Sequence, residues 1–81
     1  MPTWKIRPGT TETLPSDTTY AYAVVAAEHP DRPGIGRDYT GTLRLSRDLT
    51  VHEVTVQILA DIRTKEGWPN AAIARGSIWT V

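Results

Sequence analysis

One strongly patterned segment, residues 50–65, decides most of what this chain can fold into. It opens with Thr50 and Glu53, at the spacing of a capping box in which each side chain bonds to the other residue's backbone N–H. Gly67 and Pro69 follow the segment, and these residue types end helices. Its apolar residues recur at helical spacing, at Val51, Val54, Ile58 and Ile62. The pattern predicts a single amphipathic helix that needs a packing partner, because its β-branched residues lower its intrinsic helix propensity.

Alternating apolar and polar residues predict strands on both sides of this helix. The predicted strands are residues 3–7, 18–29, 39–46 and 77–81. Prolines and glycines within residues 30–37 forbid a regular element there, so this segment forms the tip of a long hairpin. Residues 10–17 are expected to form a loop, and residues 71–75 either a short strand or a helical turn. The predicted class is α+β: a small, mostly antiparallel sheet of the hairpin plus the N- and C-terminal strands, with the helix packed across it.

The longest predicted strand has two unlike faces. Tyr20, Tyr22 and Val24 share one face, while Ala21, Ala23 and Val25 share the other. Small residues suit close packing under a helix, which would leave the tyrosine rings partly exposed on the far side. The pattern alone leaves open which face is buried.

Length and composition exclude several classes of protein. The 81 residues are expected to form one domain, 1–81. Nine basic and nine acidic residues give zero net charge, which disfavours a dedicated nucleic-acid binder. The absence of cysteine excludes disulfides, thiolate nucleophiles and cysteine metal sites. The sequence has neither the apolar core of a signal peptide nor a long apolar run, so a cytoplasmic location without membrane contact is expected.

Residues 40–73 resemble the corresponding part of ubiquitin-like proteins. The order is a strand, an acidic-Thr helix cap, an amphipathic helix and an exit, and the most specific match is Lys65-Glu66-Gly67-Trp68-Pro69. The resemblance implies a β-grasp fold, in which a helix crosses a hairpin and a later strand adds beside the first strand. The chain ends in Trp79-Thr80-Val81 and lacks the Gly-Gly tail, so conjugation and sulfur transfer are not implied.

No residue pattern indicates catalysis, a cofactor or a metal. His52-Glu53 opens the helix without the second histidine of a zinc protease motif, so a surface histidine and a capping glutamate are the better interpretation. No serine lies in a nucleophile elbow. Gly34-Ile35-Gly36 lacks the Lys-Ser/Thr of a phosphate loop. We therefore expect a protein that is not an enzyme.

The strongest polar grouping is a set of arginines near the hairpin with tyrosines among them. The candidate partner-binding residues are Arg32, Arg37, Arg44, Arg47, Tyr20 and Tyr22. The leading hypothesis is a protein-interaction module that uses a sheet face and the 30–37 tip to bind another protein. The rival is a small nucleic-acid-binding regulatory protein that uses the hairpin arginines. A solvated face balanced by neighbouring acidic residues is the alternative without function, and a homodimer completing its sheet across an edge strand is a further possibility. The three tryptophans are interpreted as core or core-rim residues, although an exposed one would mark an interface.

Overall fold

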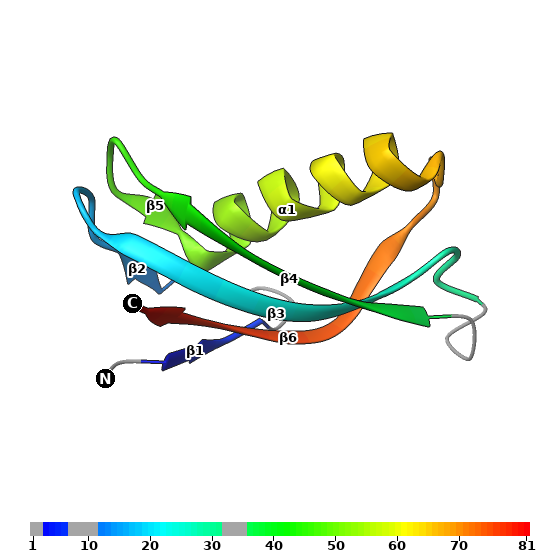
Figure 1. Ribbon diagram of the computed structural model, residues 1–81, viewed down its shortest axis with the longest axis horizontal. Helices are drawn as coiled ribbons and strands as arrows, with labels where there is room; N and C mark the ends of the chain where they lie inside the picture. Colours follow the sequence, from blue (N-terminus) through cyan, green and yellow to red (C-terminus); the bar gives the residue numbers. More distant parts are fainter. Residues whose placement is uncertain (1–2, 7–11, 32–35) are drawn as a thin grey trace.

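The computed structural model describes residues 3–6, 12–31 and 36–81 and contains one helix and two antiparallel sheets (Figure 1). The strands before the helix are β1 (Thr3–Lys5), β2 (Thr13–Leu14), β3 (Thr19–Ala27), β4 (Gly36–Arg44) and β5 (Leu49–Thr50). The helix α1 (Val51–Glu66) and the strand β6 (Ala72–Thr80) complete the order. The predicted α+β class is confirmed, with one helix against a mostly antiparallel sheet.

The main sheet has the order β1-β6-β3-β4, and every neighbouring pair is antiparallel. The hairpin of β3 and β4 pairs over its whole length, from Thr19 with Arg44 to Ala27 with Gly36. After the helix, β6 returns beside β3, and β1 adds to its other side. Residues 71–75, which the sequence left undecided, therefore lie mainly in a strand. A register shift between Val25 and Ala26 interrupts the pairing of β3 with β6.

The helix begins and ends as its sequence predicts. The Thr50 hydroxyl accepts a hydrogen bond from the Glu53 N–H at 3.1 Å, and the Glu53 carboxylate accepts one from the Thr50 N–H at 3.1 Å. At the other end Gly67 takes the left-handed conformation, with φ 66°, and its N–H donates to the Arg63 carbonyl. A left-handed C-terminal residue is cheap for glycine because it has no Cβ.

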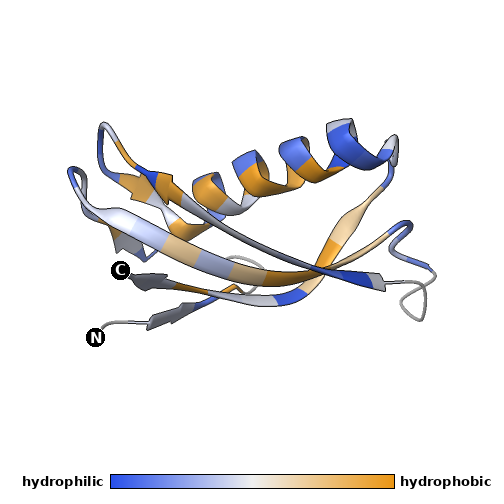
Figure 2. Cartoon of the chain, in the orientation of Figure 1, coloured by the Kyte–Doolittle hydropathy of each residue, from blue (hydrophilic) through white to orange (hydrophobic). Residues whose placement is uncertain are grey.

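The core lies between the helix and one face of the main sheet. Val51, Val54, Ile58 and Ile62 are all buried, and they form one cluster with Tyr20, Val24 and Ile78 from the sheet. Figure 2 shows the hydrophobic residues of α1 on the side that faces the sheet and hydrophilic residues on its outer side. Burial of this stripe supplies the packing that the β-branched helix needs.

The tyrosine face of β3 is the buried one. Tyr20 has 0% of its surface exposed. Its ring packs edge-on against the Trp4 ring, with 5.8 Å between the ring centres, and its hydroxyl donates a hydrogen bond to the Pro15 carbonyl at 2.7 Å. A buried tyrosine is stable where its hydroxyl has such a partner. The interpretation that places the alanines under the helix is therefore wrong, and the small residues of β3 lie on the opposite face.

The second sheet is a short one that secures the entrance of the helix. β2 pairs with β5, through Thr13 with Thr50 and Leu14 with Leu49. The first helical residue, Val51, donates its N–H to the Glu12 carbonyl at 2.8 Å. The prediction that residues 10–17 form only a loop is therefore wrong at β2, because two residues are too few to show alternation.

Candidate functional site: the open face of the main sheet

The face of the main sheet that points away from α1 is the candidate site. Residues paired across neighbouring strands share a face, and successive residues alternate between faces. Since Tyr20, Val24 and Ile78 point into the core, the residues beside them in sequence point outward. One row across this open face is Lys5, Ser77, Ala23 and Thr40. The next row is Arg75, Val25 and Asp38, and the row on the other side is Thr3, Trp79, Ala21 and Thr42.

A hollow of about 520 Å³ lies in the middle of the open face. Side chains of Ala23, Val25, Thr40 and Ser77 lie along it, with Lys5, Asp38 and Arg75 around them. Ala23 and Val25 on β3, Ser77 on β6 and Thr40 on β4 have short side chains, while Lys5 on β1 and Arg75 on β6 have long ones. The hollow is therefore a direct consequence of the alanines that β3 places outward.

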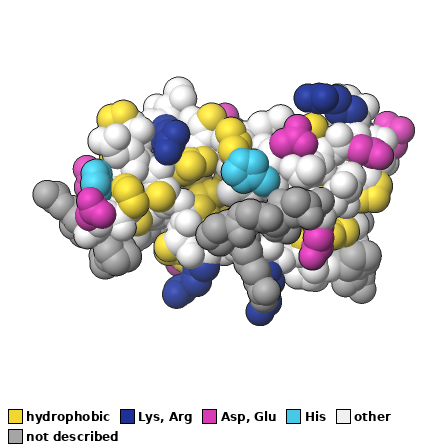
Figure 3. All heavy atoms as spheres, turned by 180° about the vertical axis from the view of Figure 1, so that it is seen from behind, with side chains coloured by type: hydrophobic (Ala, Val, Ile, Leu, Met, Phe, Trp, Pro, Cys, Tyr) yellow, Lys and Arg dark blue, Asp and Glu magenta, His cyan; other side chains and the backbone are white. Residues whose placement is uncertain are grey.

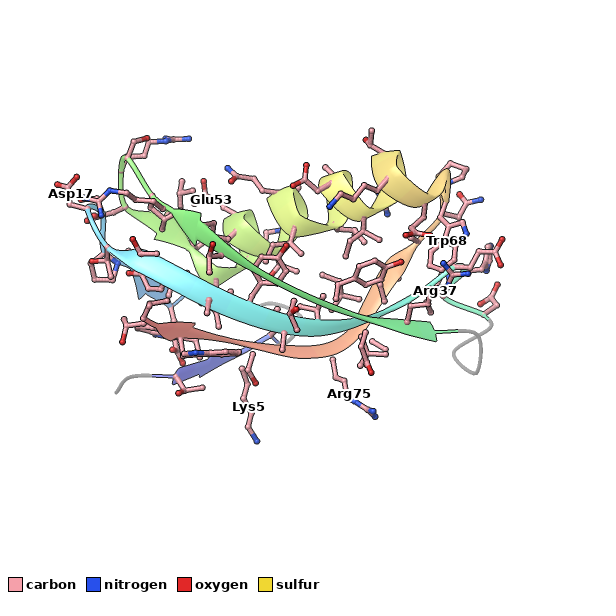
Figure 4. The ribbon with its side chains drawn as sticks, in the orientation of Figure 1. Lys5, Asp17, Arg37, Glu53, Trp68 and Arg75 are labelled. Atoms are coloured by element: carbon pink, nitrogen blue, oxygen red, sulfur yellow. The ribbon has the colours of Figure 1, made fainter. Side chains whose placement is uncertain are left out.

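Basic side chains predominate on the open face. Lys5, Arg44 and Arg75 are exposed there, and Asp38 is the acidic residue that joins them within the described residues. Figure 4 shows Lys5 and Arg75 pointing away from the sheet on the side opposite α1. Neighbouring cations on a concave surface raise the local concentration of anionic groups. Trp79, partly buried, adds an aromatic surface in the adjoining row.

The predicted arginine cluster is divided in the structure. Arg37 lies at the start of β4, where its guanidinium donates to the Glu66 carboxylate at 3.0 Å and lies 5.3 Å from the Trp68 ring centre. Figure 4 shows Arg37 and Trp68 together at the far end of the helix. Arg44 ends the same strand, about 23 Å away at strand rise, and an odd number of steps places it on the other face. Arg47 is exposed in the turn between β4 and β5, and Arg32 lies outside the described residues.

The two tyrosines proposed to contact a partner lie on the helix side of the sheet. For Tyr20 the prediction is wrong, because its surface is 0% exposed. The Tyr22 ring packs over Gly41 on the neighbouring strand, so close that a Cβ at Gly41 would lie 2.6 Å from its hydroxyl. The missed residues are Lys5 and Arg75. Alternation within residues 3–7 assigned Lys5 to one face of its strand, but residues 71–75 were left undecided, so Arg75 had no assigned face. The undecided orientation of residues 18–29 also left no way to tell which face of the sheet was open.

Tyr39, on the helix side of β4, has a perturbed ionisation. Its hydroxyl is shielded from solvent and has no hydrogen-bond partner among the described residues. Burial, followed by the nearby Glu66 carboxylate, raises the Tyr39 pKa above its ordinary value of 10.0. The Tyr39 hydroxyl therefore stays protonated at physiological pH.

Two smaller hollows lie away from the open face. One, of about 350 Å³, is polar and lies beside the helix exit, with Glu28, His29 and Asp31 opposite Trp68. The other, of about 250 Å³, runs between α1 and β6 and has Val56, Leu59 and Ile73 in its wall. Figure 3, seen from behind, shows hydrophobic side chains gathered near the centre of that view beside a histidine. The described residues contain no group of three metal-binding side chains in either place.

Comparison with known protein families, with characterised proteins and with solved structures found no match for this chain. Within the described part of the chain, no helix is long and apolar enough to cross a membrane.

Proposed function

We propose that this chain is a non-catalytic protein-interaction module that binds an acidic segment of another protein on the open face of its main sheet. The observation that carries the proposal is the hollow of about 520 Å³, which has the Lys5 and Arg75 side chains beside it. α1 covers one face of the sheet, and no helix or strand among the described residues covers the other face.

The chemistry of the face suits an extended peptide. The low floor of alanine, valine and threonine side chains accepts an apolar side chain by shape, while the basic residues at its margin attract carboxylates. Trp79 lies one row from the hollow, and partly buried tryptophans are frequent anchors in interfaces. An acidic segment with apolar residues between its carboxylates would use both properties.

The order of elements agrees with the order that the ubiquitin-like resemblance implies. A hairpin, a crossing helix and a strand beside the first hairpin strand occur in the order that the resemblance over residues 40–73 implies. β6 runs antiparallel to β3, so the sheet is antiparallel throughout. We retain the ubiquitin-like assignment as a proposal that rests on the sequence of the helix exit.

The same face makes nucleic acid the weaker candidate partner. Sheet surfaces that bind single strands stack several bases on aromatic side chains. Within the described part of the open face Trp79 is the single aromatic residue, because β3 and β4 direct their tyrosines towards the helix. A cationic face without a stacking platform favours carboxylates on a peptide.

The proposal can be tested by amide chemical-shift mapping with a short peptide of alternating glutamate and valine. We expect shifts in β1, β3 and β6, and at least a tenfold weaker titration for the double variant Lys5→Glu/Arg75→Glu, since two attractive contacts become repulsive. The matched control Arg47→Glu/Lys65→Glu makes the same charge change on exposed residues elsewhere and should bind as the wild type does.

Three outcomes would overturn the proposal. Shifts confined to α1 or to the helix exit would place the binding site elsewhere. Equal weakening in the control variant would mean that net charge, and not this face, drives the titration. Tighter binding of a single-stranded oligonucleotide than of the peptide, lost in the Lys5→Glu/Arg75→Glu variant, would assign the face to nucleic acid.

A further inference from the structure

The outer edge of β4 is long, regular and unpaired within the described residues. β4 spans nine residues, Gly36–Arg44, and pairs with β3 on one side only. No proline or register shift interrupts it, although such devices commonly blunt the edges of natural sheets. Its outer N–H and C=O groups can therefore accept another strand.

We propose that this edge pairs with the same edge of a second copy of the chain, in an antiparallel register centred on Gly41. The reason is that the strand is complementary to itself in this register. Asp38 of each copy lies opposite Arg44 of the other, Thr40 opposite Thr42, and Tyr39 opposite Leu43. Opposite charges and threonine pairs are favourable combinations across antiparallel strands, and the Tyr39–Leu43 pair sets two apolar surfaces against each other.

Neighbouring registers lose this complementarity. Centred on Thr40, the pairing would set Asp38 against Thr42 and Arg44 against Gly36. Centred on Thr42, it would set Arg44 against Thr40 and leave Asp38 beyond the paired residues. Of these three registers, the one centred on Gly41 gives Asp38 of each copy a basic partner, Arg44 of the other copy. Each pair occurs twice because the two-fold axis passes between the two Gly41 residues.

The faces of the strand are also compatible with this pairing. Asp38, Thr40, Thr42 and Arg44 all belong to the open face, while Tyr39 and Leu43 belong to the helix side and pack against the core. A two-fold axis perpendicular to the sheet keeps each set on its own side. The product is one continuous eight-stranded sheet with both helices on one side and both hollows on the other. This inference is independent of what the open face binds.

Charge exchange tests the register directly. In one copy Asp38 and Arg44 lie about 20 Å apart along the strand, so they cannot compensate each other within the monomer. We expect wild-type protein to show a concentration-dependent dimer by sedimentation velocity. Asp38→Arg and Arg44→Asp should each weaken dimerisation at least tenfold, because each sets like charges opposite one another twice. The double variant Asp38→Arg/Arg44→Asp should dimerise again.

Mixing the two single variants gives the sharpest result. A copy with Asp38→Arg and a copy with Arg44→Asp are complementary only to each other, so we expect an equimolar mixture to form a heterodimer that neither forms alone. Asp61→Arg, on the exposed side of α1, is the control and should dimerise like the wild type. A monomeric wild type at high micromolar concentration, or a mixture that stays monomeric, would overturn the proposal.

If a charge variant fails to fold, a measurement on wild-type protein still tests the proposed dimer. In wild-type protein, amide hydrogen exchange of alternate β4 residues should slow as protein concentration rises, since pairing protects their N–H groups. Exchange that is independent of concentration throughout β4 would contradict the proposed edge even if every charge variant were unstable.

Discussion

Replacing Gly76 by alanine tests the packing between β6 and the core. A Cβ at this position would lie 2.6 Å from Val24 Cγ1, 2.9 Å from the Ala23 backbone oxygen and 3.1 Å from Ile6 Cδ1. Ordinary contacts between such atoms begin near 3.5 Å. The backbone oxygen belongs to the paired region of β3 and β6, so it cannot withdraw without disturbing the sheet.

Two opposing effects decide whether this substitution raises or lowers the free energy of unfolding. Removing a glycine from a strand stabilises by about 0.5–1 kcal/mol through the unfolded chain. Forcing a methyl group into a filled core costs about 1–3 kcal/mol. We therefore expect Gly76→Ala to lower the free energy of unfolding by about 1–2 kcal/mol. In a domain of this size the loss corresponds to a fall in melting temperature of roughly 4–16 °C.

The matched control is Gly41→Ala in the neighbouring hairpin. Its new methyl group would meet only the outer atoms of the Tyr22 ring, at 2.6–2.9 Å, and a partly buried side chain can rotate away. We expect it to cost less than Gly76→Ala. Thermal and urea unfolding by circular dichroism measure both variants. A Gly76→Ala protein as stable as the wild type, or less affected than Gly41→Ala, would refute the packing argument.

Three further predictions concern capping and ionisation. Thr50→Ala should lower the free energy of unfolding by about 1 kcal/mol, with Thr50→Ser close to the wild type in urea titrations. The hydrogen bond from the Thr50 N–H lowers the Glu53 pKa below 4.5. The ionised Glu53 carboxylate therefore stabilises the fold above pH 4.5, and this stabilisation is lost as pH falls through the lower pKa of the folded state. Glu53→Gln should flatten the dependence of stability on pH in that range. The raised Tyr39 pKa means that stability falls as pH rises above 10.0, and Glu66→Gln should lower that pKa in an ultraviolet titration while burial keeps it above 10.0. A Glu53→Gln protein with unchanged acid sensitivity, or a Tyr39 pKa indifferent to Glu66, would contradict these assignments.

The helix and the strands of the main sheet could be predicted because their signals are local, whereas the two-residue strands β2 and β5 were not predicted. The Thr50–Glu53 box, the apolar stripe and Gly67 act within one helix, and each lies within a residue or so of the expected position. Strand alternation likewise located the hairpin, although β4 begins three residues earlier than expected, at Gly36, and β6 five residues earlier, at Ala72. Gly76 weakens the strand pattern, yet its position over Val24 explains why glycine is there.

The candidate site could not be predicted because it depends on which face of β3 is buried. Alternation assigns Tyr20 and Ala21 to opposite faces but does not say which face meets the helix. The deciding contacts come from distant segments, namely the Pro15 carbonyl that accepts from the Tyr20 hydroxyl and the Trp4 ring beside it. Likewise, arginines close together in sequence were separated because a nine-residue strand carries Arg37 and Arg44 to opposite ends.

The hydrogen bond from the Val51 N–H to the Glu12 carbonyl links the start of α1 to the small sheet of β2 and β5. The first amide of an isolated helix has no acceptor and exchanges freely with solvent. Here its acceptor, the Glu12 carbonyl, lies nearly forty residues earlier, directly before β2, which is held by the pairing of Leu14 with Leu49. Amide exchange at Val51 should therefore report opening of the small sheet, and Leu14→Ala should accelerate it while the amide of Ile62, bonded within the helix, changes less. The protection of the first amide of α1 therefore depends on the pairing of β2 with β5.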